Sequence, residues 1–587
     1  AERNSLSTTT SGPPRAKYFH VYLDVRAFVA SPCAPGETAE LYFSLYNKAE
    51  ARFLTEEYCI VLNHQGVPAR ESEGRLDKMR ALFSDLSPTD MLDLNLVCRI
   101  VRNGAMRMSS QEGKSGVEAA SAEHNFDGAD EYYLGNAGPR RSRMTTDRTF
   151  RRPFGCAVLE LGQHHQFALD TVSSSSLKEH VMPIFVPVNE AAFSTLHQDI
   201  IASRIKELEK SPRAEMLAVN IKVFHGDTES IVRENSSLLQ DAVLTARLGF
   251  PDVVFPGDKR NEAYMKLWSG EFFPQGGKIA GGNTARNIQV SVEIRDTEGR
   301  VLENVISRGT GEPLVTEFDS LVFYHQNAPT WGELVKLELP DDLIEQCHLF
   351  FTIRHRSTKE ERTTQSTAAA LAESNKPIAY GYFPLFAPSK AFVADGSHSI
   401  TLFKSQRHGS SLSPDLYFNL HPTLDPGRSG VESIPMHLQG VFQPLRDSLI
   451  VRTFLVSTRY TQNEVILRLI NWSSSLANDV NSLRSVLTQF TFVGEVEIVK
   501  FLRDIFDALF GIMVSGINSQ GELDDLVFNA LITVLGIVQD RRVSIVDCAA
   551  QRAALTAKLL LCSSRTSVPL STSISSSTSA SQMSMSG

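Results

Sequence analysis

The sequence has no apolar run long enough to cross a membrane, and it carries no excess of positive charge. Its longest uncharged apolar stretches, residues 508–518 and 526–538, are shorter than the ~20 residues that a membrane-spanning helix needs. The formal net charge is −9 over 587 residues, and Lys and Arg form no continuous stripe. We therefore predict neither a membrane span nor a nucleic-acid partner.

Cysteine pairs are also missing. The seven cysteines are odd in number, lie mostly inside apolar runs, and include no Cys-x-x-Cys pair. No histidine stands near them at the spacing of a zinc site. This usage is typical of a reduced, cytosolic chain, and it predicts no metal and no cofactor.

Motifs for nucleotide binding or nucleophilic catalysis are incomplete. Gly113-Lys114-Ser115 resembles the end of a phosphate-binding loop, but Met108 occupies the position of its first glycine. Gly309-Thr310-Gly311 lacks the third glycine of a dinucleotide fingerprint, and no Gly-x-Ser-x-Gly elbow occurs. The sequence offers no site for a self-standing enzyme, and we predict that this chain is not one.

What the sequence does contain, from Tyr18 to about residue 250, is the period-2 alternation of half-buried strands. Strands are predicted near residues 18–28, 39–47, 58–62, 94–101, 156–161 and 219–223. Residues 103–150 are rich in Gly, Ser, Ala and charge, so we expect an inserted mobile loop there. Helices are expected at about 198–210 and 229–247, and residues 1–17 are expected to be a disordered tail.

A second set of strands is predicted at 264–268, 288–294, 321–324, 334–339, 349–354, 378–385 and 399–404. Both sets contain a strand that ends in arginines (LNLVCRIVR, then HLFFTIRHR) and one with an aromatic-glycine step (RPFGCAVLEL, then IAYGYFPLF). The spacing of roughly 240 residues between the sets predicts two tandem sandwiches of similar topology. Chance similarity between strands is the alternative.

From Arg446 the period changes to 3.6 residues, with one apolar stripe at residues 498–512 and another at 523–538. We expect the start of a helical repeat array over residues 440–545, in which about two helix pairs leave one apolar face without a neighbour. Residues 546–587 form an atypical Ser/Thr/Met-rich tail, and the chain begins at Ala1 without a Met. Both ends are typical of a fragment or a truncated gene model.

Four segments resemble the Dock (dedicator of cytokinesis) family, and most closely its Rac-activating, Dock180-like branch. They are RRPFGCAVLEL at 151–161, RLGFPDVVFP at 247–256, SGEFFPQGGKIAGGNTARN at 269–287 and VKFLRDIFDAL at 499–509. The resemblance runs from about Tyr18 to Arg542. It implies a Dock amino-terminal region at 18–250, a first Dock homology region of C2 type at 251–425, and then the start of an armadillo-like array. It also implies an SH3 domain ahead of Ala1 and an exchange domain beyond Gly587.

The function implied by the resemblance is the membrane-docking and regulatory part of a guanine-nucleotide exchange factor for Rac-type small GTPases. The C2-type domain would bind phosphoinositides, above all phosphatidylinositol trisphosphate, without calcium. Implied partners are a phosphoinositide membrane surface and, through parts of the full-length protein mostly absent here, an ELMO-type adaptor and a Rac-type GTPase. The implied location is cytoplasmic, with peripheral recruitment to the plasma membrane. The open alternative is a structural scaffold or adaptor-binding region that binds no lipid.

Two loops of the second sandwich hold the candidate head-group site. Calcium needs clustered carboxylates, and these loops are basic instead, which suits the Arg and Lys contacts of a phosphorylated head group. Pro274 and Gln275 stand where relatives often carry another Lys. The candidate residues are Lys278 and Arg286 in the first loop, and Arg354, Arg356, Lys359 and Arg362 in the other.

The structural alternative for these loop residues is ordinary solvated charge. A further basic run, Arg140 to Arg152, is open to three interpretations: a second membrane contact, a phosphorylation address or a solvated linker.

Overall fold

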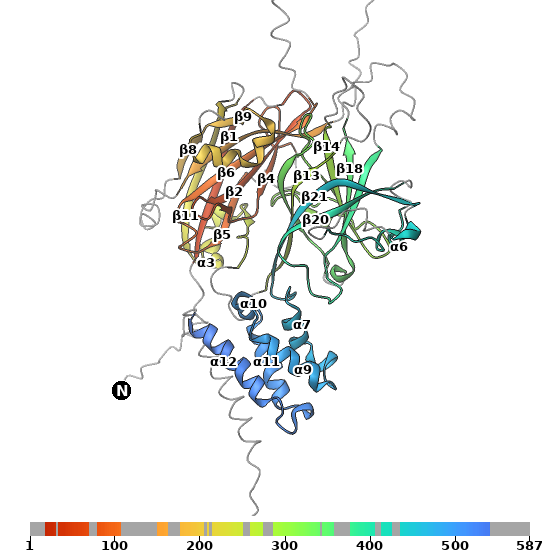
Figure 1. Cartoon of the computed structure of the whole chain (residues 1–587). Coiled ribbons are helices and arrows are strands. Elements are labelled where there is room, and N and C mark those ends of the chain that lie inside the picture. The colour runs from red at the N-terminus through yellow and green to blue at the C-terminus, as the bar shows by residue number, and fades with distance from the viewer. Residues whose placement is uncertain are drawn as a thin grey trace, which may run out of the picture. The chain divides into compact units, whose positions relative to one another are not determined.

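The computed structural model divides the chain into a β-rich unit that extends to Gln462 and a helical unit that begins at Asn463 (Figure 1). The residues that the structure describes are 18–30, 33–69, 79–106, 149–161, 177–204, 208–210, 214–250, 259–273, 286–340, 343–356, 376–405, 412–424, 435–438 and 440–540. The expected loop, most of residues 103–150, and both expected tails lie outside these ranges. The order of the regions confirms the predicted fold class, a β-sandwich, a C2-type sandwich and then helices.

The first sandwich is built from two sheets. Its strands are β1 (Tyr18–Ala30), β2 (Thr38–Asn47), β3 (Arg52–Phe53), β4 (Tyr58–Asn63), β5 (Arg80–Leu86), β6 (Leu94–Gly104), β7 (Phe150–Glu160), β8 (Lys178–Met182), β9 (Ile184–Pro187), β10 (Leu208–Lys210), β11 (Ala214–Gly226) and β12 (Val243–Thr245). One sheet has the order β12-β5-β1-β11-β8, and the other has β10-β9-β7-β6-β2-β3, with β4 also paired to β2. The alternating apolar side chains, such as Val21, Leu41 and Cys98, form the core of this sandwich.

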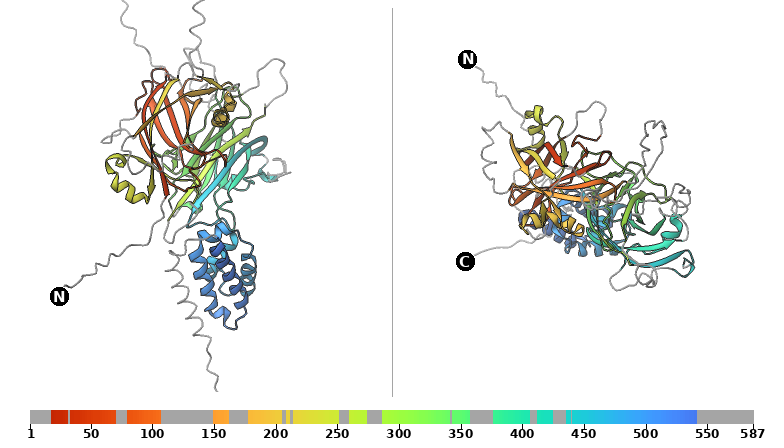
Figure 2. Two further views of the ribbon diagram at one scale, coloured as in Figure 1. Left: turned by 90° about the vertical axis from the view of Figure 1, so that its left-hand side faces the viewer. Right: turned by 90° about the horizontal axis from the view of Figure 1, so that it is seen from above.

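The second sandwich is a single antiparallel sheet that wraps around its own core. Its strands are β13 (Asn261–Glu271), β14 (Ile288–Arg295), β15 (Ile306–Ser307), β16 (Glu317–Asp319), β17 (Thr330–Leu337), β18 (His348–His355), β19 (Pro377–Pro384), β20 (Gly396–Ser405) and β21 (Phe442–Ser457). Their order is β15-β17-β13-β21-β20-β19-β18-β14-β16. Trp331, Val290 and Phe351 lie in the core. The two strand-rich halves lie side by side in the β-rich unit (Figure 2).

The two sandwiches share a strand order, which confirms the predicted similar topology. The neighbours β5-β1-β11 recur as β17-β13-β21, and β2-β6-β7 recur as β14-β18-β19. β20 pairs with β21 along most of its length and with β19 at Phe403. In the first sandwich this strand is divided at Pro183 into β8, which pairs with β11, and β9, which pairs with β7. Proline has no N–H to donate to a ladder, which accounts for the break.

The aromatic-glycine steps have the same structural reason in both sandwiches. A Cβ on Gly155 of β7 would lie 2.6 Å from the carbonyl oxygen of Phe185 in β9. A Cβ on Gly381 of β19 would lie 2.9 Å from the side chain of Ile400 in β20. Glycine is required at both positions because the next strand approaches too closely for any side chain.

Both helices expected before residue 250 are shorter than predicted. The first, α2 (Leu196–Ile201), follows the 3-10 turn η3 (Glu190–Thr195) and ends near Ser203, whose φ is 53°, and Leu208–Lys210 pairs with β9 instead. The second is divided at Asn235 into α3 (Thr228–Glu234) and α4 (Ser236–Leu239), and Val243–Thr245 runs parallel to β5. Long-range strand pairing overrides local helix propensity in both places.

Two predictions in the second half were also wrong. Residues 321–323 are buried and Tyr324 is partly buried, but they form no strand. The N–H groups of Leu321, Val322 and Tyr324 bond to Glu333, Arg151 and Glu190 instead of to a ladder. The helical period expected from Arg446 begins later, since β21 extends to Ser457 and lies between β13 and β20. The shorter elements of this half are η5 (Ile344–Gln346), α6 (Pro414–Tyr417) and η8 (Met436–Leu438).

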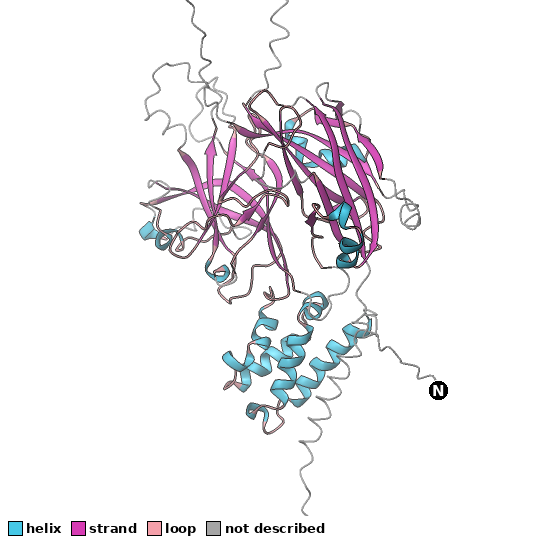
Figure 3. Ribbon diagram, turned by 180° about the vertical axis from the view of Figure 1, so that it is seen from behind, coloured by secondary structure: helices cyan, strands magenta, loops and turns pink. Residues whose placement is uncertain are grey.

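The helical unit contains α7 (Glu464–Ile470), α8 (Trp472–Ser475), α9 (Val480–Phe490), α10 (Glu495–Lys500), α11 (Leu502–Met513), η9 (Gly516–Asn518) and α12 (Asp524–Asp540), which Figure 3 colours cyan. The predicted apolar stripes meet in its core, and α11 packs on α12 as the expected hairpin. α12 also exposes Phe528, Ile532 and Leu535 by 61%, 51% and 46% at helical spacing. No helix in the described part of the chain has the length and apolarity to cross a bilayer.

Candidate functional site

The two predicted loops leave the second sandwich at the same end. β14 begins where β18 ends, and Ile288 is paired with His355 across the antiparallel ladder. Arg286 precedes Ile288 by two residues, Arg356 directly follows His355, and Arg354 is opposite Gln289. Three of the six candidate residues therefore gather at the adjoining ends of two paired strands, while Lys278, Lys359 and Arg362 lie outside the described residues.

Asn287 ties this end of the sandwich together. Its backbone N–H donates to His355 Nδ1 at 3.1 Å, its side-chain Nδ2 donates to the Arg356 carbonyl at 2.7 Å, and its Oδ1 accepts from the backbone of His325 at 2.8 Å. Asn287 is nearly fully buried. The bases of three segments are thus held in one geometry, which preorganises any ligand contacts made from them.

Arg286 has a cationic atom without a hydrogen-bond partner among the described residues. Its backbone N–H donates to Asn327 Oδ1 at 2.9 Å, but its Nη1 is buried and makes no hydrogen bond within the described residues. Burial and the Arg286 charge both lower the pKa of His355, so that ring is neutral and accepts from Asn287. A buried donor left without an acceptor is costly, and an anionic oxygen would satisfy it.

Arg354 and Arg356 already make contacts on the outer face of the sheet. Arg354 Nη1 donates to Ser291 Oγ at 2.7 Å and lies 3.6 Å from Glu317 Oε1. The Arg356 Nε donates to Gln289. Both side chains are therefore held beside the loop bases rather than extended freely into solvent.

Acidic groups stand close to the same arginines. Asp447 of β21 accepts from the Phe273 backbone at 2.9 Å through Oδ1, and its Oδ2 is buried without a partner in the described ranges. Burial raises the pKa of Asp447 although Arg286 acts to lower it. Glu317 likewise has a raised pKa because of burial and the nearby Asp319. These acids reduce the positive potential available to an anionic ligand.

Sequence reasoning missed Asn287, Asp447 and Glu317, because each is an ordinary polar residue in its local sequence. A polar residue directly before a strand was the available signal for Asn287. Within the described residues, no cluster of three or more His, Cys, Asp or Glu side chains has the arrangement of a metal site.

A second polar cluster joins the two sandwiches and centres on Arg151 of β7. Its Nε donates to Glu40 Oε2 at 2.9 Å, and its Nη1 lies 2.6 Å from Glu333 Oε1 in β17. Arg308 of the second sandwich also contacts Glu40, at 3.2 Å. Burial would raise the pKa of Glu40, but Arg151 and Arg308 lower it to about 2. The cluster is a largely buried ion network that requires both sandwiches.

The basic run that ends at Arg152 is therefore not a uniform solvated linker. Arg151 and Arg152 are both buried, and Arg152 pairs with Glu190 and donates to the Val322 carbonyl. Neither is available to a membrane or to a modifying enzyme, so those interpretations were wrong for these two positions. The other members of the run, Arg140, Arg141, Arg143 and Arg148, lie outside the described residues.

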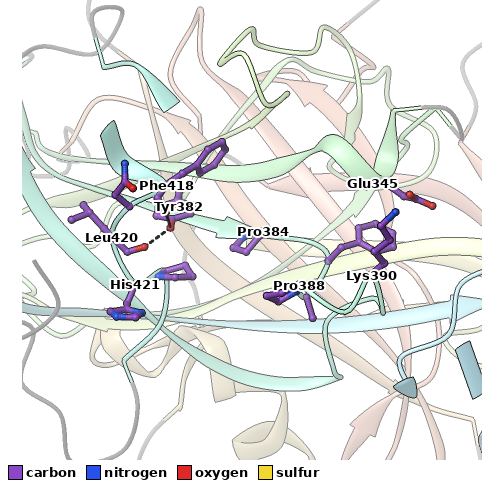
Figure 4. A pocket seen from close by; sticks show the side chains of 12 residues that line it. Glu345, Tyr382, Pro384, Pro388, Lys390, Phe418, Leu420 and His421 are labelled. Atoms are coloured by element: carbon purple, nitrogen blue, oxygen red, sulfur yellow. Dashed lines mark hydrogen bonds between the residues drawn. The ribbon is translucent and has the colours of Figure 1, made fainter. Parts of the chain in front are cut away.

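A shallow hollow of about 550 Å³ lies away from the predicted loops, between β19 and the segment after α6 (Figure 4). Its wall is mainly apolar, and Tyr382 donates to the Leu420 carbonyl within it. The lining residues are Glu345, Tyr382, Pro384, Phe386, Ala387, Pro388, Lys390, Phe418, Asn419, Leu420, His421 and Pro422. The three candidate site residues that the structure describes, Arg286, Arg354 and Arg356, do not line it.

Three family models match successive parts of the chain. The DOCK N-terminus model matches residues 3–251, the model of the C2 domain in Dock180 and Zizimin proteins matches residues 256–465, and the model of the Dedicator of cytokinesis (DOCK) TPR region matches residues 479–549.

Curated relatives match almost the whole chain at moderate identity. Dedicator of cytokinesis protein 3 from Mus musculus is 30% identical over 528 residues, which cover 89% of this chain and 23% of the relative. Dedicator of cytokinesis protein 4 from Homo sapiens is 28% identical over 532 residues, which cover 90% and 23%. The chain thus spans about a quarter of the length of these relatives.

Among solved structures, a C2 domain of plant Extended Synaptotagmin 1 matches 34% of this chain and 97% of that domain, at 9% identity and a TM-score of 0.17. A likeness of this degree adds nothing to the family models, which alone assign the second sandwich as a C2 domain. The models follow one another in order along the sequence, and the two curated relatives carry the same family name. The chain belongs to the Dock family, of which it carries the amino-terminal region, the C2 domain and part of the helical TPR region.

Proposed function

We propose that this chain is the membrane-docking and regulatory part of a guanine-nucleotide exchange factor, and that its C2 domain binds phosphoinositide head groups without calcium. The ligand class is a multiply phosphorylated inositol lipid, above all phosphatidylinositol trisphosphate. The protein would then act at a cytoplasmic membrane surface, the plasma membrane, to which this domain recruits it.

The observation that supports this proposal best is the buried Nη1 of Arg286, which has no hydrogen-bond partner in the part of the chain that is described. It lies where the loop before β14 ends and the loop after β18 begins, at the end of the sheet that also carries Arg354 and Arg356. A phosphate group offers several anionic oxygens, so it can accept from more than one guanidinium at once. Lys278 and Lys359 belong to the same two loops and would add point charges, and Arg362 would add a planar guanidinium.

Phe273, at the end of the strand that leads into the first loop, strengthens the membrane interpretation. Its side chain is 48% exposed, whereas the neighbouring Phe272 is buried. An exposed aromatic ring beside basic residues suits the boundary between lipid head groups and acyl chains.

The GTPase and adaptor partners rest on the family alone. The Dock resemblance implies a Rac-type GTPase and an ELMO-type adaptor, bound through parts of a full-length protein that this chain mostly lacks. We propose that the chain by itself is not an exchange enzyme. The purified chain should leave the rate of nucleotide release from Rac unchanged, and stimulation of GDP release would overturn that part of the proposal.

The test of lipid binding is co-sedimentation with phosphatidylcholine vesicles with and without phosphatidylinositol trisphosphate. Arg286→Ala should weaken binding about tenfold, and joint replacement of Lys278, Arg286, Arg354 and Arg356 by Ala should abolish it. Arg26→Ala with Arg52→Ala in the first sandwich is the control, because these exposed arginines lie beside nearby acids and away from the two loops. Thermal melts check folding. Unchanged sedimentation of the folded quadruple variant would place the site elsewhere.

One observation favours the second candidate, a scaffold that binds no lipid. Arg354 and Arg356 already contact Glu317 and Gln289, and Asp447 stands close to Arg286. Equal sedimentation of the unaltered chain with both kinds of vesicle would make the scaffold the better account.

A further inference from the structure

The edge strand β16 of the C2 domain is held by the first sandwich. β16 has three residues and pairs on one side with β14. On its other side, Arg151 Nη1 donates to the Asp319 carbonyl at 2.7 Å, and the Arg151 guanidinium lies 5.3 Å from the centre of the Phe318 ring. The Arg151 carbonyl also accepts from the Val322 backbone at 2.8 Å. So short an edge strand depends on such contacts for its position.

We call the contacts between Arg151 and β16 the clamp. A series of hydrogen bonds leads from this clamp to the candidate lipid site. The Asp319 carboxylate accepts from Ser291 Oγ at 2.5 Å, and Ser291 Oγ accepts from Arg354 Nη1 at 2.7 Å. Glu317, two residues before Asp319, lies 3.6 Å from the same Arg354 atom. Arg151, Asp319 and Ser291 therefore form a continuous path between the inter-sandwich ion network and Arg354.

We propose that Arg151 of the first sandwich is a positioning residue for head-group binding, acting on Arg354 through Asp319 and Ser291. This inference rests on the proposed lipid-binding function. It adds that head-group affinity depends on the packing of the two sandwiches against each other. The amino-terminal region would then set the affinity of the C2 domain without touching the ligand itself.

The physical reason is preorganisation of one guanidinium. Arginine has several rotatable bonds, and fixing them at the moment of binding reduces affinity. The path holds Nη1 of Arg354 on Ser291, so the guanidinium is already fixed in place when a phosphate arrives. Loss of the clamp would let β16 shift, and Ser291 would lose the acceptor that orients its hydroxyl group.

The experiment uses the full chain and vesicles of phosphatidylcholine with phosphatidylinositol trisphosphate. Ser291→Ala should weaken binding about fivefold, and Arg151→Lys about threefold, because Lys keeps the charge but cannot hold all of the Arg151 acceptors in a planar fork. Thr352→Val is the matched control. Thr352 is buried opposite Ser291 in the sheet and is not a member of the path, so this variant should bind as the unaltered chain does.

A double-mutant cycle separates positioning from general loss of stability. In an Arg354→Ala background, Arg151→Lys should have no further effect on binding, because the residue it positions is gone. In an Arg286→Ala background, Arg151→Lys should still weaken binding about threefold. Equal effects of Arg151→Lys in both backgrounds would show a structural role only and overturn the inference.

The two proposals fail in different ways. If Arg286→Ala and Arg354→Ala leave binding unchanged, the proposed lipid site is wrong. If they weaken binding while Ser291→Ala and Arg151→Lys do not, the site stands and the positioning path is wrong. Should Arg151→Lys fail to fold, the Ser291→Ala variant against Thr352→Val decides the matter.

Discussion

The two sandwiches share one strand order, yet the arginines at the corresponding end differ in whether they are paired with an acid in the part of the chain that the structure describes. In the first, where β2 begins and β6 ends, Arg102 Nη1 donates to both carboxylate oxygens of Glu37, at 2.8 and 2.9 Å. The same carboxylate also accepts from the backbones of Ala34 and Ala105. In the second, where β14 begins and β18 ends, Arg286 keeps a buried Nη1 without a partner among the described residues.

This difference separates a structural use of arginine from the binding use that we propose, on a common framework. A neutralised pair holds two segments together and offers little to a ligand, whereas a guanidinium nitrogen that lacks an acceptor can still donate to an anionic oxygen. The comparison explains why the second sandwich, and not the first, is the candidate for lipid binding.

The largest expected effect concerns stability. Arg102→Ala should destabilise the β-rich unit by on the order of 3 to 5 kcal/mol, because it leaves Glu37 with an uncompensated charge at a mostly buried site. Arg286→Ala should cost less, about 1 kcal/mol or less, since it breaks no hydrogen bond of Nη1 among the described residues and removes the charge that acts on Asp447. Thermal or urea unfolding of both variants measures this. Equal destabilisation would erase the contrast between the two ends.

The second effect concerns the ion network that joins the sandwiches. The pKa of Glu40 is lowered from its ordinary value near 4.5 to about 2 by Arg151 and Arg308. Its contribution is fully present above pH 4.5 and is lost as the pH falls towards 2, so stability should drop by on the order of 3 kcal/mol across that window.

The matched variant for this test is Glu40→Gln, which keeps the shape but not the charge. It should be less stable at neutral pH and show a flatter acid profile. An acid profile identical to that of the unaltered chain would mean that Glu40 is not the titrating group.

A smaller effect would sharpen the binding side of the comparison. Asp447→Asn should raise affinity for trisphosphate vesicles about threefold, because it removes a negative charge next to Arg286 and keeps the oxygen that accepts from Phe273. Because burial raises the pKa of Asp447, stability falls as the pH rises from the ordinary carboxyl range through the raised folded-state pKa, and above that pKa the loss is complete. The variant should therefore also be slightly more stable at neutral pH. Weaker binding would show that Asp447 orients Arg286 rather than opposing the ligand.

The smallest effect is an expected absence of change on adding calcium. Both the melting temperature and vesicle binding should be the same with calcium and with a chelator, since a ligand that binds the folded state would raise stability. A chelator-sensitive melting temperature would show that one of the sandwiches holds calcium after all.

Much of the fold could be predicted because its signals are local. Each of these signals can be read from a few neighbouring residues. They are the alternation in β1, β2 and β6, the aromatic-glycine steps at Gly155 and Gly381, and the apolar stripes of α11 and α12. The wrong predictions arose where the local pattern of a short segment was ambiguous. Residues 446–457 alternate only weakly, and the helical period predicted from Arg446 is wrong there because these residues belong to strand β21.

The sequence by itself determined the succession of two sandwiches and a helical unit, and it placed basic residues in the two candidate loops. Only the tertiary structure decided which arginines are occupied: Arg151 and Arg152 in a basic run became buried ion partners, Arg354 was bound to Ser291, and Arg286 was left with an atom that has no partner among the described residues. The physical reason is the distance along the sequence over which each interaction acts. Periodicity depends on residues a few positions apart. The ion partner of Arg151, by contrast, is Glu333, which is 182 positions away and meets Arg151 only when the two sandwiches pack together.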